Sequence, residues 1–130
     1  METTGKTKPE NITLHQLFVH QMVNQDDLLH KGAYDRFKSE HTITVPVDDV
    51  ALASYHVQQL MSEIGEVLDA DKRWKSHRND KFDKEEKLEE LADCFIVLMN
   101  IAMFSGFDGR TMAEVIEKKL NIVTNRINEI

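Results

Sequence analysis

Two pairs of acidic residues have the type and spacing that could hold a metal ion. Glu63 and Glu66 are three residues apart, and after 23 intervening residues Glu90 and Asp93 repeat that spacing. Residues three apart on an α-helix point from the same side. A hairpin of two such helices would bring four carboxylates together, and they could not all stay ionised there without a cation.

The same acids have a simpler interpretation as two solvated faces, because the chain contains 23 acidic residues. Two features favour a site. The first pair borders an apolar stripe centred on Ile64, and the second pair leads into Cys94 and Val97, whereas a solvated face should continue with polar residues. Neither pair includes the histidine that carboxylate di-iron bundles use. Ligation by oxygen alone suits Mg²⁺ or Mn²⁺, cations that also bind phosphate-bearing substrates.

The composition limits the classes of function. A chain of 130 residues forms one domain, and a net charge of −7 argues against binding nucleic acid through its phosphates. The single cysteine, Cys94, excludes an intramolecular disulfide and fits a reduced, cytoplasmic setting. The longest apolar stretch is interrupted by Asn100 and is too short to span a membrane. The polar residues 1–11 show no signal peptide, and we expect them to form a disordered arm before a domain at 12–130.

Apolar residues at helical spacing predict an all-α fold of four helices. In chain order, the predicted helices span 12–31, 49–75, 83–105 and 111–130. Gly32 should stop the first helix, Asp48 or Asp49 should cap the second, and Thr111 followed by Glu114 resembles a capping box for the last. The segment 32–48 contains Pro46 and is expected to be a crossing loop rather than a short strand.

The two acidic pairs, with the sequence around them, resemble the signature of the all-α NTP pyrophosphatase superfamily, which includes the MazG-type enzymes and the dimeric dUTPases. The stretch SEIGEVLDADKRWK is similar to the first metal helix of dimeric dUTPases, and EELADCFIVLMNIA is similar to the second metal helix of the superfamily. The similarity extends over about 49–130. It departs from the MazG-type pattern at Ser62, where a glutamate is common, and at Val123, where the last helix often has an asparagine.

The resemblance implies a four-helix MazG-like bundle that hydrolyses a nucleoside triphosphate to the monophosphate and pyrophosphate. The implied residues fall into two groups. The metal ligands would be Glu63, Glu66, Glu90 and Asp93, with Glu63 or Glu66 also acting as the general base. The groups that would contact substrate are Asp69, Lys72, Lys75, Asn100, Lys119 and Arg126. Mg²⁺, or alternatively Mn²⁺, would be the cofactor, and a homodimer or homotetramer the expected assembly.

Three functions remain open from the sequence. The first is the nucleotide pyrophosphohydrolase, with a pyrimidine substrate such as dUTP or dCTP favoured by the dUTPase-like stretch after Glu66. The second is a non-catalytic helical module that binds a divalent cation or a partner protein. The third is a plain helical bundle whose acids are solvated. Binding to Mg²⁺ or Mn²⁺ separates the third from the others, because a ligand of the native state must stabilise it.

Overall fold

The computed structural model describes residues 11–37, 44–75 and 82–130, and these residues form an all-α fold. The four helices are α1 (Leu14–His30), α2 (Val50–Ala70), α3 (Lys84–Met103) and α4 (Gly109–Asn128), with two single 3₁₀ turns, η2 (Asp35–Phe37) and η3 (Lys72–Trp74). The described residues contain no strand. The all-α prediction is therefore confirmed, whereas the arm predicted for 1–11 lies, apart from Asn11, outside the described residues.

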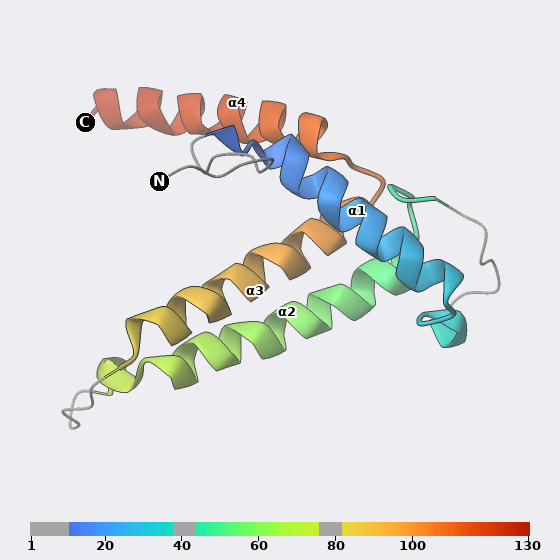
Figure 1. The fold of residues 1–130 in the computed structure, drawn as a ribbon. Helices are drawn as coiled ribbons and strands as arrows, with labels where there is room; N and C mark the ends of the chain where they lie inside the picture. Colours follow the sequence, from blue (N-terminus) through green and yellow to red (C-terminus); the bar gives the residue numbers. More distant parts are fainter. Residues whose placement is uncertain (1–10, 38–43, 76–81) are drawn as a thin grey trace.

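The helices form two antiparallel pairs that meet at one end of the molecule (Figure 1). Helices α2 and α3 lie side by side as a long hairpin, and α4 packs against α1. Helix α1 crosses the end of the hairpin where α2 begins and α3 ends. From this end α4 runs away from the hairpin, so that the two pairs diverge (Figure 1).

Side-chain caps set the starts of the helices. Asp49, one of the two predicted candidates, caps α2, and Asp83 caps α3. Each carboxylate accepts from backbone N–H groups of the first turn. Helix α4 begins earlier than predicted. Its cap is Asp108, whose carboxylate accepts from the N–H of Thr111 at 2.9 Å, so the predicted capping box at Thr111 is wrong. At the end of α1, Gly32 has a φ of +80°, and it stops the helix as predicted.

Helix α2 is shorter than the sequence predicts. It ends at Ala70 and not near Lys75, because Asp71 leaves the helical region with φ −140° and ψ 99°. The Asp71 side chain then caps η3 by accepting from the N–H of Arg73 at 3.1 Å. Trp74 consequently lies in a separate turn and does not continue the face of α2 that carries Glu63.

The core lies where α1 crosses the hairpin. Its buried residues are Phe18, Leu29, Tyr34, Val45, Leu52, Met103 and Phe104. His56 is buried among them and stacks on Phe104, with ring centroids 5.3 Å apart and planes 4° apart. The Tyr34 hydroxyl donates to Gln25 Oε1 at 2.7 Å, which pairs two buried polar groups.

The segment before α2 is fastened to the end of α3. Asp48 and Ser105 form an isolated antiparallel bridge, with Val47 N–H donating to Met103 O and Asp49 N–H donating to Phe104 O, both at 2.9 Å. The described residues of 32–48 form a 3₁₀ turn and this bridge but no strand, whereas 38–43 lie outside the described residues.

The outer part of the hairpin, away from α1, is packed differently. Within 57–70 of α2 and 84–96 of α3, no residue is buried. The helices are in contact along this length, yet they share no apolar core there. All four predicted metal ligands lie in this outer part of the hairpin.

Candidate metal centre

The four acids converge from the two helices of the hairpin. Glu63 and Glu66 lie one turn apart on α2, and Glu90 and Asp93 lie one turn apart on α3. One carboxylate oxygen each of Glu63, Glu90 and Asp93 can be chosen so that all three lie within 4.8 Å of one another. The fourth acid, Glu66, lies close enough to Glu90 to raise the pKa of that carboxyl. The structure therefore brings three of the four carboxylates that the sequence singles out into one group, with Glu66 beside it.

The proximity of these carboxylates disfavours their ionised forms. The pKa of Glu63 is raised by burial and then by the charges of Glu66 and Asp93. The pKa of Glu90 is raised first by the hydrogen bond with Glu66, then by burial and by the surrounding acids. Without a cation, the mutual repulsion of these carboxylates therefore shifts Glu63 and Glu90 toward protonation.

Two of the oxygens lack partners although water cannot reach them. Glu63 Oε2 and Glu90 Oε2 are both buried and have no hydrogen-bond partner. Leaving a buried carboxylate oxygen unsatisfied is costly, and in native proteins such an atom usually has a bound ion or water as its partner. A divalent cation fits this donor set, because it would ligate the two oxygens and offset the repulsion that raises the pKa values.

Cys94 lies directly after Asp93 and is partly buried. Burial raises the pKa of its thiol, and the charges of Glu63, Asp93, Glu90 and Glu66 raise it further. The thiol is therefore kept protonated beside the carboxylates, and a neutral thiol is a poor ligand for a hard cation.

The predicted phosphate-binding groups near the end of α2 lie beyond the acids along the hairpin. Asp69 is exposed in the last turn of α2, and Lys72 and Lys75 lie within and just after η3. The Lys75 ammonium lies 5.3 Å from the centroid of the Trp74 ring, and the Trp74 indole N–H donates to Leu68 O at 3.2 Å. This short turn presents an aromatic ring beside basic side chains.

The structure places the other predicted substrate contacts elsewhere. Asn100 is buried on α3, and its Oδ1 accepts from Gln21 Nε2 of α1 at 2.9 Å, so its observed bond joins two helices. Lys119 and Arg126 are exposed on α4, which packs against α1 and not along the hairpin (Figure 1). Within one chain, the two cations of α4 are not assembled with the carboxylates.

Asp71 is a buried carboxylate near the metal centre that was not predicted from the sequence. Asp71 is only 7 % exposed and forms ion pairs with Arg73 at 2.7 Å and with Lys87 of α3 at 2.9 Å. These two hydrogen bonds hold the pKa of Asp71 well below its usual range. The sequence did contain a pattern that indicates it. An aspartate followed directly by basic residues is typical of a helix end at which the carboxylate pairs with a neighbouring cation.

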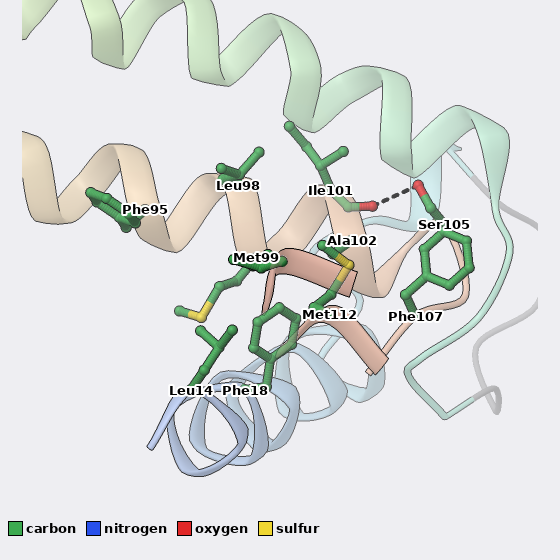
Figure 2. A pocket seen from close by; sticks show the side chains of 11 residues that line it. Leu14, Phe18, Phe95, Leu98, Met99, Ile101, Ala102, Ser105, Phe107 and Met112 are labelled. Atoms are coloured by element: carbon green, nitrogen blue, oxygen red, sulfur yellow. Dashed lines mark hydrogen bonds between the residues drawn. The ribbon is translucent and has the colours of Figure 1, made fainter. Parts of the chain in front are cut away.

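A separate apolar pocket opens between α1, α3 and the start of α4 (Figure 2). Its volume is about 490 Å³. The polar side chain in its lining is Ser105, whose hydroxyl donates to Ile101 O at 2.7 Å within the same helix end. None of the four acids lines it, so its walls suit an apolar partner rather than a phosphate.

Searches against family models, curated proteins and solved structures found no match to this chain. None of the described helices combines the length and the apolar character needed to cross a membrane.

Proposed function

We propose that this protein is a Mg²⁺-dependent nucleoside triphosphate pyrophosphohydrolase that forms the monophosphate and pyrophosphate and so cleans the nucleotide pool. The observation that supports it is the convergence of Glu63, Glu90 and Asp93 from two helices, with their oxygens within 4.8 Å of one another. Triphosphate hydrolysis needs charge neutralisation and positioning more than covalent chemistry, and a cation held by carboxylates supplies both.

The four acids would together ligate the cation. Glu63 and Glu90 each offer a buried oxygen without a partner, and Asp93 and Glu66 complete an all-oxygen donor set. When bound, Mg²⁺, or Mn²⁺ in its place, neutralises charge on phosphate oxygens and lowers the pKa of water. Glu66 is exposed, so it can accept the proton of the attacking water, and Glu63 is the other candidate for that role.

The basic side chains would bind the remaining charge of the triphosphate. Lys72 and Lys75 lie beyond the acids at the end of the hairpin, and Asp69 precedes them at the end of α2. Lys119 and Arg126 project from an exposed helix. We assign to Asn100 a contact with sugar or base, which requires it to exchange or share its bond with Gln21.

We propose a pyrimidine deoxynucleotide, dUTP or dCTP, as the substrate. The support is the similarity of SEIGEVLDADKRWK to dimeric dUTPases. An exposed Trp74 beside Lys75 offers a flat ring and a positive charge at one end of the hairpin, which suits a base and its phosphates.

We also propose that the working form is a homodimer or homotetramer. Helix α4 is exposed from Glu114 onward, and its apolar residues Ile116, Leu120, Val123 and Ile127 recur at the spacing of one helical face. An apolar face of this length is expected to be covered in solution. A second copy could cover it and bring Lys119 and Arg126 to the carboxylates.

A panel of nucleoside triphosphates with Mg²⁺ tests the activity. We expect release of pyrophosphate and a monophosphate, fastest with dUTP or dCTP. Glu66→Gln and Asp93→Asn should abolish release, whereas Glu114→Gln, which changes an exposed acid on α4, should leave the rate unchanged. Orthophosphate as the sole product, or full activity in Asp93→Asn, would contradict the proposal.

The second candidate is a non-catalytic module of the same fold that binds a divalent cation or a partner protein. The observation that favours it is the separation of Lys119 and Arg126 from the carboxylates within one chain. Saturable Mn²⁺ binding combined with no product from any nucleotide in the panel would establish this reading.

A further inference from the structure

Asp71 is a buried residue at the outer end of the hairpin, where the described residues of α2 and α3 form no apolar core. The residues of α2 and α3 around the metal centre are exposed or half-buried, but Asp71, directly after α2, is buried. Apolar burial usually fixes the separation of two packed helices. Here another interaction must do so, because the acids between the two helices repel one another.

Asp71 connects the end of α2 to the first turns of α3. Its Oδ1 accepts from Arg73 Nε at 2.8 Å, and its Oδ2 accepts from Arg73 Nη2 at 2.7 Å and from Lys87 Nζ at 2.9 Å. The Arg73 guanidinium lies 3.4 Å from the centroid of the Phe82 ring, directly before the cap of α3. Lys87 stands one turn before Glu90, a distance of about 4.5 Å along the helix axis.

We infer that Asp71 and Lys87 form a positioning pair, which holds α2 and α3 at the separation at which Glu63, Glu90 and Asp93 can ligate one divalent cation. The inference rests on the proposed cation site and adds residues that do not touch the cation. It follows from three facts: the carboxylates repel, no apolar core opposes the repulsion, and the ion pair closes the hairpin one turn away.

The direction in which a mutation changes the cation affinity distinguishes a positioning role from a simple charge effect. Lys87→Met removes a positive charge close to a cation site, so through-space electrostatics alone would tighten cation binding. Loss of positioning would weaken it instead. A merely structural role would lower the melting temperature and leave the affinity unchanged.

Mn²⁺ is the probe, and its free and bound forms are distinguished by electron paramagnetic resonance. We expect Lys87→Met to bind Mn²⁺ about tenfold more weakly than the unmodified protein, the loss typical of removing groups that orient ligands. Lys87→Arg, which keeps the charge, should largely restore the affinity. The matched control is Lys84→Met, which removes a charge from the exposed first turn of α3 and should not weaken binding. Unchanged or tighter binding in Lys87→Met would overturn the inference.

A second measurement works without metal. Spin labels at Ser62→Cys and Glu89→Cys, both exposed and on opposite helices, report the width of the hairpin when Cys94→Ser removes the native thiol. In EDTA, Lys87→Met should broaden the distribution of label distances and move it to larger values, and Lys84→Met should not.

The two measurements separate failure of this inference from failure of the proposed function. If the unmodified protein does not bind Mn²⁺, the cation site is wrong, and the label distances still decide whether the pair sets the hairpin. If it binds Mn²⁺ and Lys87→Met changes neither affinity nor distance, the positioning role is wrong and the cation site stands.

Discussion

The imidazole of His56 stacks on the ring of Phe104, joining the first turns of α2 to the end of α3 inside the core. Tyr34 and Tyr55 meet the same imidazole edge-on, and its Nδ1 pairs with Gln59 Oε1 at 3.1 Å. Its Nε2 is buried without a partner. The hairpin is therefore anchored at its inner end by a buried histidine, and burial lowers the pKa of its imidazole.

Stability should fall as the solution becomes acidic because of His56. Burial lowers its pKa below the ordinary 6.5, against a smaller opposing effect of Gln59. A histidine with a lowered pKa in the folded state stabilises the fold fully at a pH above its ordinary pKa. This stability is lost as the pH falls through the folded-state pKa. The loss is about 1.4 kcal/mol for each unit by which folding lowers the pKa. The melting temperature should drop less between neutral and acidic pH in His56→Leu than in the unmodified protein. An equal drop in both would contradict the assignment, and His20→Leu, at an exposed position, is the control.

Removing one carboxylate should stabilise the protein without metal and abolish its response to metal. Glu90→Gln relieves the repulsion that raises the pKa of Glu90, so its melting temperature in EDTA should exceed that of the unmodified protein. At a Mg²⁺ concentration about 100-fold above Kd, mass action should stabilise the unmodified protein by about 2.7 kcal/mol and the variant far less. Glu117→Gln on exposed α4 should behave like the unmodified protein. Equal Mg²⁺ responses from the protein and Glu90→Gln would argue for solvated acids.

Substituting alanine for two of the glycines should change the free energy of unfolding in opposite directions. A Cβ at Gly109 would lie 2.7 Å from Phe18 Cβ and 2.9 Å from His15 Cα, where α4 starts against α1. We expect Gly109→Ala to cost about 1–3 kcal/mol, the usual penalty for overpacking. A Cβ at Gly65, inside α2, meets nothing within 4 Å, so Gly65→Ala should gain roughly 0.5–1 kcal/mol from helix propensity. Urea denaturation of both variants measures the difference, and a stabilised Gly109→Ala would contradict the packing of α1 on α4.

Mixing two inactive variants should restore activity if a second copy supplies the cations of α4. Asp93→Asn lacks a metal ligand, and Arg126→Glu reverses a charge on a different helix. In a symmetric dimer with shared sites, mixed pairs contain one fully intact site, so an equal mixture should recover about a quarter of the unmodified activity. The control is a mixture of Asp93→Asn with Glu66→Gln. Each site takes all its carboxylates from one chain, and every chain in this mixture lacks one of them, so no intact site can form. Absence of recovery in the first mixture would place Arg126 outside the shared site.

The sequence predicted the helices and the acidic centre because both depend on local spacing. Apolar recurrence located four helices, and three-residue spacing placed each acid pair on one side of its helix. Convergence of the pairs followed from a short connection between antiparallel neighbours. The errors lie at helix ends, where Asp71 broke α2 before Lys75 and Asp108 displaced Thr111 as the cap of α4. Single side chains decide such ends, and periodicity carries no information about them.

The remaining features depend on contacts between distant residues. Lys87 meets Asp71 across 16 positions, and Gln21 meets Asn100 across 79, so neither pair has a signal in local spacing. The direction of α4 also escaped prediction. The direction depends on the turn after Phe104 and on the close packing of Phe18 against Gly109, which has no Cβ. It determines where Lys119 and Arg126 lie.

The absence of buried residues along the outer hairpin has a consequence for local opening. Amide hydrogens there are shielded by helix hydrogen bonds and by half-buried side chains, whereas those near Leu52 and Met103 are shielded by the buried core as well. Regions with little apolar packing open at a lower free energy than the whole protein. Deuterium should therefore enter 57–70 and 84–96 long before it reaches the inner end, and a divalent ion should slow that uptake selectively.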